Sequence, residues 1–113
     1  MVNPQRRNIQ RFEIHLTNLD PTIGSEIRKT RPCVIISPDE MNRHLNTAII
    51  APLTSARRHY PSRIDVSFQG RKGQIVLDQI RTVDQSRLIT RLGVLTESQA
   101  RLLASKLGEM FAL

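Results

Sequence analysis

Four charged side chains gather within six residues, directly before a proline and an apolar segment. They are Glu26, Arg28, Lys29 and Arg31, and Pro32 follows them. Because proline restricts the preceding residue to extended backbone, Arg31 is predicted to begin a strand, whereas Arg28 and Lys29 stay on a loop. A rigidly held guanidinium can stabilise charge in a transition state, and mobile cations can steer a polyanion. Alternatively, Arg31 pairs with Glu26 and braces the loop, and the sequence leaves both interpretations open.

A second polar cluster follows the apolar segment 47–53. Thr54 and Ser55 come at its end, and Arg57 and Arg58 follow in a polar loop. Hydroxyl groups at a strand end commonly form turns, but they can also bond a phosphate oxygen or a ribose hydroxyl.

A third cluster stands where the predicted strand 74–80 ends. It contains Gln79 and Arg81. Arg81 could contact phosphate through its planar fork, or it could form a surface ion pair with Asp84. Gln79 could contact substrate, or it could be a satisfied core amide.

Other catalytic chemistries find no support in the residues. The three histidines, His15, His44 and His59, have no pair at metal-ligand spacing. Cys33 begins an apolar segment and is predicted to be a core residue rather than a nucleophile. The chain contains no phosphate-binding glycine loop and no GxSxG or HExxH motif. We therefore expect no metal and no cofactor.

Composition narrows the class of partner. The 113 residues suit one domain, which we place at residues 12–113 after a flexible arm over 1–11. Lys and Arg number 17 against 10 acids, a net charge of +7, and most of the cations are arginines, which favours nucleic acid. Aromatic content is only 4%, which argues against a sheet of exposed stacking rings. The single cysteine, with no apolar run long enough to cross a membrane and no secretory signal, favours the cytoplasm.

Short strands dominate the predicted elements. Strands are expected near residues 12–17, 33–37, 47–53, 63–68 and 74–80, with a turn over 69–73 in which Gly70 and Gly73 adopt positive φ. Residues 38–45 are predicted as a short helix, capped by Ser37 or Asp39. We expect a small, mainly β fold, an SH3-like antiparallel barrel with a C-terminal helix.

The C-terminal helix has the clearest local signals. Thr96 and Gln99 have the spacing of a capping box. Apolar residues then recur at helical spacing, namely Ala100, Leu103, Ala104, Leu107 and Phe111. A domain of this size does not cover the whole stripe, so a homodimer is expected.

Taken together, the motifs closely resemble the MazF/PemK/Kid family of toxins, which are ribosome-independent mRNA endoribonucleases of toxin–antitoxin pairs. The resemblance runs from about residue 11 to the C-terminal helix and rests on Asp20-Pro21, Gly24, Glu26, Lys29, Arg31-Pro32, Pro52, Thr54-Ser55, Asp78-Gln79, Arg81-Thr82 and Asp84. It implies a CcdB/Kid/MazF-like fold, catalysis by Arg31 and Thr54 with Glu26 nearby, and substrate contacts around residues 79–81. The family strand usually begins R-G-[DE]-[IV]-W, whereas this chain has Arg11-Phe12-Glu13-Ile14-His15. That departure alters part of the RNA-facing surface, so we expect a sequence preference peculiar to this chain.

The resemblance implies a sequence-specific, metal-independent endoribonuclease that cleaves single-stranded RNA to 2′,3′-cyclic phosphate and 5′-hydroxyl ends. Arg31 suits neutralisation of the phosphorane, Thr54 orientation of the phosphate or hydroxyl, and Glu26 is the candidate general base. RNA-binding residues are expected to be Arg28, Lys29, Ser55, Arg57, Arg58, Gln79 and Arg81.

Two alternatives belong to other functional classes. A toxin of the same fold could poison DNA gyrase, as in the CcdB branch, but that branch is associated with a Trp-Gly-Ile ending and this chain ends Phe-Ala-Leu. A plain SH3-like nucleic-acid-binding module would account for the charge but not for Glu26, Arg31 and Thr54. A cognate acidic antitoxin is the expected protein partner, because carboxylates would cover the basic loops.

Overall fold

The computed structural model describes residues 8–113, which form seven strands, two α-helices and two short 3₁₀ turns. The strands are β1 (Glu13–Asn18), β2 (Thr30–Ile35), β3 (Thr47–Thr54), β4 (Arg63–Phe68), β5 (Arg71–Val76), β6 (Arg81–Asp84) and β7 (Leu88–Val94). The helices are α1 (Asp39–His44) and α2 (Glu97–Phe111), and the turns are η1 (Leu77–Gln79) and η2 (Gln85–Arg87).

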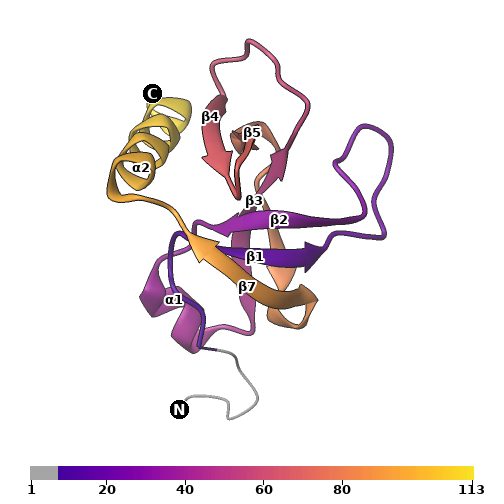
Figure 1. The fold of residues 1–113 in the computed structure, drawn as a ribbon. Helices are drawn as coiled ribbons and strands as arrows, with labels where there is room; N and C mark the ends of the chain where they lie inside the picture. Colours follow the sequence, from indigo (N-terminus) through magenta and orange to yellow (C-terminus); the bar gives the residue numbers. More distant parts are fainter. Residues whose placement is uncertain (1–7) are drawn as a thin grey trace.

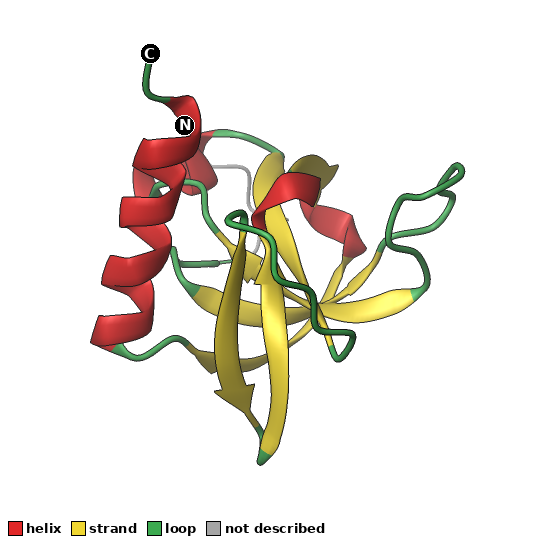
Figure 2. Ribbon diagram, turned by 90° about the horizontal axis from the view of Figure 1, so that it is seen from above, coloured by secondary structure: helices red, strands yellow, loops and turns green. Residues whose placement is uncertain are grey.

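The strands form one curled antiparallel sheet. Their order is β4-β5-β3-β2-β1-β7, and β6 pairs with β3 beside this path. The long strand β3 pairs with β6 along its first half and with β5 at its end, so that the sheet bends around it. α2 lies at one side and the β1–β2 loop projects at the other (Figures 1 and 2). This half-barrel with a C-terminal helix confirms the predicted fold class.

Two strands were missed by the sequence analysis. The predicted strand 74–80 ends at Val76, η1 follows, and β6 and β7 lie in a segment to which the sequence analysis assigned no element. β7 is the edge strand beside β1, and four of its seven residues, among them Ile89, are exposed. Because an edge strand need not alternate, hydrophobic periodicity could not reveal it.

Local capping was predicted correctly at α2 and wrongly at α1. Thr96 and Gln99 form the full capping box at the start of α2. Pro38 is the N-cap of α1 and no side chain caps it. Ser37 instead donates its hydroxyl to Asn42, at 2.5 Å from Oγ to Oδ1.

The apolar stripe of α2 is only partly covered. Leu103 is fully buried, and Ala100 and Leu107 pack against the core as partly buried residues. Ala104 is exposed and Phe111 is 67% exposed, so these two stripe positions do not face the core of this chain.

Glu13, His15 and Thr17 of β1 are buried, although their alternation with apolar residues is the pattern of a half-solvated strand. Glu13 accepts hydrogen bonds from the backbone N–H of Gln10 (2.9 Å) and from Nε of Arg91 (2.8 Å), and its Oε1 lies 3.1 Å from Nε2 of His15. Burial alone would raise the pKa of Glu13, but these bonds outweigh it and lower the pKa. The negative charge of Glu13 therefore fastens β1 to β7.

Residues 1–7 of the predicted arm lie outside the described residues. Within the rest of that segment, Ile9 is buried in a core cluster with Leu19 and Leu88, and the backbone N–H of Arg11 donates to Asp39. Across residues 8–113, no helix has the length and apolar character needed to cross a membrane.

Candidate active site

Arg31 and Thr54 lie at the ends of adjacent strands. Cys33 of β2 pairs with Pro52 of β3, and the same antiparallel register continued by two residues sets Arg31 opposite Thr54. Arg31 is also paired with Thr17 of β1, so its backbone is held on the side away from β3. The prediction that Arg31 lies in extended backbone at the start of a strand is confirmed.

Both side chains line one surface cavity of about 710 Å³, which we call the Arg31 cavity. Its lining includes Lys29, Ser55, Phe68, Arg71 and Lys72. None of its four cationic side chains forms an ion pair within the described part of the chain. A cavity of this composition can hold a phosphate and neutralise charge that develops on it.

Arg71 and Lys72 were not among the predicted site residues. They begin β5 and lie within the segment 69–73, which the sequence analysis treated only as a turn. The sequence feature that could have indicated them is the pair of cations between two glycines, because side chains beside a tight turn lie at the end of a strand.

Thr54 forms a turn, and its role toward RNA stays a prediction. Its Oγ1 accepts a hydrogen bond from the backbone N–H of Ala56 at 3.2 Å, as expected for a hydroxyl that forms a turn. The hydroxyl proton stays available to a phosphate or ribose oxygen in the cavity.

Gly73 touches the backbone of Thr54. It does not adopt the positive φ that we expected, because it lies inside β5, and Gln69 and Gly70 make the turn with φ of 52° and 74°. A Cβ at Gly73 would come within 2.6 Å of the carbonyl oxygen of Thr54. Glycine is therefore required here by the close approach of two strands beside the site.

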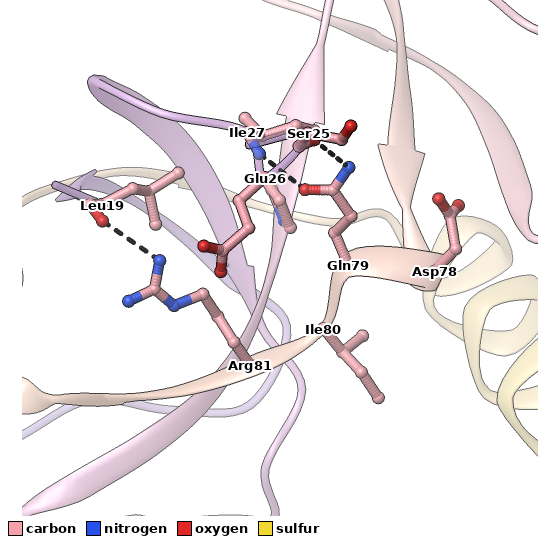
Figure 3. Close-up of a pocket in the computed structure, with 9 residues that line it drawn as sticks. Leu19, Ser25, Glu26, Ile27, Asp78, Gln79, Ile80 and Arg81 are labelled. Atoms are coloured by element: carbon pink, nitrogen blue, oxygen red, sulfur yellow. Dashed lines mark hydrogen bonds between the residues drawn. The ribbon is translucent and has the colours of Figure 1, made fainter. Parts of the chain in front are cut away.

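Glu26 lies in a different cavity. This Glu26 cavity has a volume of about 390 Å³ and is also lined by Asp78, Gln79 and Arg81. Glu26 accepts a hydrogen bond from the backbone N–H of Ile23 at 2.6 Å, and its carboxylate extends toward the Arg81 side of the cavity (Figure 3). The bracing pair between Glu26 and Arg31 is not formed; Arg31 instead donates through Nε to the carbonyl of Arg28 at 2.8 Å.

Gln79 and Arg81 hold the β1–β2 loop. The amide of Gln79 accepts from the N–H of Ile27 (2.6 Å) and donates to the carbonyl of Ser25 (3.3 Å), as Figure 3 shows. Arg81 donates to the carbonyl of Leu19 at 3.1 Å. Gln79 is therefore a satisfied amide facing a loop rather than the core, and its RNA contact remains a prediction.

The alternative ion pair between Arg81 and Asp84 is absent. Asp84 accepts from the backbone N–H of Ser86 at 2.9 Å. Hydrogen bonding by the side chain of Ser86 and then by its backbone N–H, with weaker help from Arg87, lowers the pKa of the Asp84 carboxyl. The guanidinium of Arg81 is therefore not paired with Asp84 and lies beside the Glu26 cavity.

Arg57 and Arg58 lie in the β3–β4 loop and line a third cavity of about 440 Å³. Arg28 is exposed on the β1–β2 loop. The predicted RNA-binding residues are therefore distributed over the β1–β2 loop, the β3–β4 loop, and the segment of η1 and β6 that carries Gln79 and Arg81.

Cys33 is confirmed as a core residue. It is fully buried, and burial raises the pKa of its thiol to about 12, against weaker lowering by Thr17, Arg81 and Arg31. A thiol with this pKa is not a nucleophile near neutral pH. Among residues 8–113, no group of three or more His, Cys, Asp and Glu side chains is placed to hold a metal ion.

The fold and the site together define a class: a small basic half-barrel protein with an arginine–threonine pair at the ends of two strands. A family model described as the PemK-like, MazF-like toxin of type II toxin–antitoxin systems matches residues 10–111, and the chain belongs to this family.

Individual relatives agree with this assignment. The chain is 35% identical over 97 residues to Endoribonuclease MazF of Staphylococcus epidermidis, covering 80% of this chain and 81% of that protein. It is similar in fold to crystalline MazF from Deinococcus radiodurans, with a TM-score of 0.82, 23% identity and coverage of 95% and 99% of the two chains. An endoribonuclease in complex with its cognate antitoxin, from a mycobacterial species, gives a TM-score of 0.78 at 22% identity, covering 93% and 96%.

Proposed function

We propose that this toxin is a metal-independent endoribonuclease that cleaves single-stranded RNA, mRNA in particular, at a specific sequence. The observation that supports this most is that Arg31 and Thr54 line one cavity with three further cations, Lys29, Arg71 and Lys72, which form no ion pair with any described residue. The 35% identical relative, named an endoribonuclease, supports the same activity.

In the proposed mechanism, the 2′-hydroxyl next to the scissile bond attacks the phosphorus, and the 5′-oxygen of the following nucleotide leaves. The products are a 2′,3′-cyclic phosphate and a 5′-hydroxyl end. Arg31 neutralises the negative charge on the phosphorane, because its guanidinium is held by β2 and by the carbonyl of Arg28. Thr54 orients a phosphate oxygen or the attacking hydroxyl. Arginine is a poor proton carrier, since its pKa lies above about 12.

Glu26 is the proposed general base. In the structure its carboxylate is bound to the Ile23 N–H and faces the Glu26 cavity rather than the Arg31 cavity. Proton transfer therefore requires the exposed loop that carries Glu26 to shift toward Arg31 when RNA binds. The roles of Arg28, Lys29, Ser55, Arg57, Arg58, Gln79 and Arg81 in binding RNA form part of the same proposal.

The experiment that tests this function is cleavage of a long transcript by the purified protein in EDTA. We expect discrete cuts with 5′-hydroxyl ends, detected because polynucleotide kinase labels them without prior phosphatase treatment. Undiminished cutting in EDTA is expected because the proposed chemistry uses only side chains. An intact transcript, or cuts that appear only with added Mg²⁺, would contradict the proposal.

We also propose that the toxin is a homodimer whose basic loops are covered by a cognate acidic antitoxin. Three apolar side chains of α2 are exposed and could be buried by a partner, namely Leu102, Met110 and Phe111. The arginines of the β1–β2 and β3–β4 loops could bind the carboxylates of an acidic partner. An acidic segment that folds on the toxin would bind quickly and compete with RNA.

Light scattering at micromolar concentration should give twice the chain mass. Titrating the antitoxin against toxin bound to uncleavable RNA should release the RNA, with an association rate that falls as salt is raised. A monomeric mass, or a ternary complex with undiminished RNA affinity, would count against the respective proposal.

A further inference from the structure

A glutamine of the sheet binds the middle of the β3–β4 loop. Gln74 of β5 is 5% exposed and lies opposite Thr54 in the β3–β5 ladder. Its Oε1 accepts from the backbone N–H of Arg58 at 3.0 Å, and its Nε2 donates to the carbonyl of Arg58 at 2.9 Å. The side-chain amide thus pairs with Arg58 as the backbone of a neighbouring strand would.

All hydrogen-bonding atoms of this amide are used. The second hydrogen of Nε2 is donated to Oδ1 of Asp65 at 2.9 Å. Burying an amide is unfavourable unless it is fully bonded, and an aliphatic side chain would fill this core position without such partners. What the glutamine adds is a fixed position for the middle of an otherwise exposed loop.

Gln74 and the loop enclose the cavity of about 440 Å³, which we call the Arg58 cavity, and which is also lined by Arg57, Tyr60 and Arg63. Arg57 and Arg58 form no ion pair among the described residues, so both charges are open to an anion.

The guanidinium of Arg63 is already bound within the protein. It donates to both oxygens of Asp78, at 2.9 and 3.3 Å, and its guanidinium lies 5.2 Å from the centre of the Tyr60 ring. Tyr60 is nevertheless 53% exposed, so the ring is held by a cation and still accessible to a planar group.

Given the proposed endoribonuclease function, on which this rests, we infer that the Arg58 cavity is a subsite for one nucleotide of single-stranded RNA outside the scissile bond. Its phosphate binds to Arg57 and Arg58, its base stacks on Tyr60, and Gln74 is the positioning residue that sets Arg58 in place. Gln74 lines this cavity and its neighbour in the chain, Gly73, lines the Arg31 cavity, so one RNA strand can occupy both together.

The test measures binding of a random-sequence pool of fully 2′-O-methylated RNA 20-mers, which cannot be cleaved, by fluorescence anisotropy. Arg58→Ala should weaken binding about tenfold and reduce the slope of log Kd against log salt by about 0.7, the loss of one phosphate contact on a single strand. Tyr60→Ala should weaken binding by a similar factor without changing that slope. Arg101→Ala, which removes an exposed cation of α2, is the matched control for net charge.

The positioning role is tested by a double-mutant cycle. Gln74→Leu alone should weaken binding nearly as much as Arg58→Ala, and adding Arg58→Ala to it should cost little more. Cleavage should show a raised KM with kcat at saturating RNA unchanged. Gln74→Met is uncharged, keeps a similar size and loses the amide, so it repeats the cycle if the leucine variant does not fold.

Fully additive costs in the cycle, or a fall in kcat at constant KM, would overturn the positioning role. A second outcome is that the wild-type protein cleaves RNA, but the Arg58→Ala and Tyr60→Ala variants bind RNA as tightly as the Arg101→Ala control. In that case the proposed subsite is wrong and the proposed function stands. Unchanged RNA binding with weakened binding of a polyglutamate peptide would assign the cavity to a protein partner. A wild-type protein that neither binds nor cleaves RNA would instead remove the proposed function itself.

Discussion

Arg31→Ala is expected to lower kcat by about a hundredfold or more, the usual effect of removing one preorganised group that stabilises an oxyanion. The loss should be this large because β1, Pro32 and the carbonyl of Arg28 fix the guanidinium before RNA arrives. The measurement is single-turnover cleavage at saturating RNA, where binding defects do not contribute.

Arg28→Ala is the matched control for Arg31→Ala. Arg28 is an arginine of the same loop, but its side chain is exposed, so it should raise KM and leave most of kcat. Equal values of kcat for Arg31→Ala and the wild type would remove Arg31 from the mechanism.

Glu26→Gln separates the general-base role from charge neutralisation. If Glu26 takes the proton, this variant should also lower kcat and should lose the acidic limb of the pH–rate profile. A variant that changes only KM would place Glu26 with the groups that bind RNA in its own cavity.

Gly73→Ala is expected to lower kcat tenfold or more and to destabilise the fold by about 1–3 kcal/mol, the range for an overpacked site. The added methyl group would meet the Thr54 carbonyl oxygen at 2.6 Å, and both atoms belong to paired strands, so β3 or β5 must shift. Displacing the backbone of Thr54 misplaces its hydroxyl, and small misplacements of reacting groups strongly reduce rate.

Urea unfolding and single-turnover cleavage measure the two effects of Gly73→Ala separately. Gly108→Ala in α2 is the control, because a Cβ at Gly108 would have no neighbour within 4 Å and alanine should stabilise the helix by about 1 kcal/mol. If both variants cleave RNA like the wild type, the close approach of Gly73 has no bearing on the site.

The sequence by itself determined the local features of this protein. The apolar segments predicted β1 to β5, the spacing of Thr96 and Gln99 predicted the capped start of α2, and Pro32 predicted an extended Arg31. Each of these follows from sterics or hydrogen bonds between residues close in the chain, so it can be found without knowing the fold. The family motifs added the likeness to MazF toxins and the choice of Arg31 and Thr54.

Tertiary structure decided which side chains share a cavity. Glu26 lies five residues before Arg31, yet the loop turns its carboxylate toward Arg81 and away from Thr54. Gln74 meets Arg58 across 16 residues, and Gln79 meets Ile27 across 52. These contacts depend on strand register and on the curl of the sheet around β3. Both arise from the packing of segments distant in sequence, and no local pattern of residues encodes them.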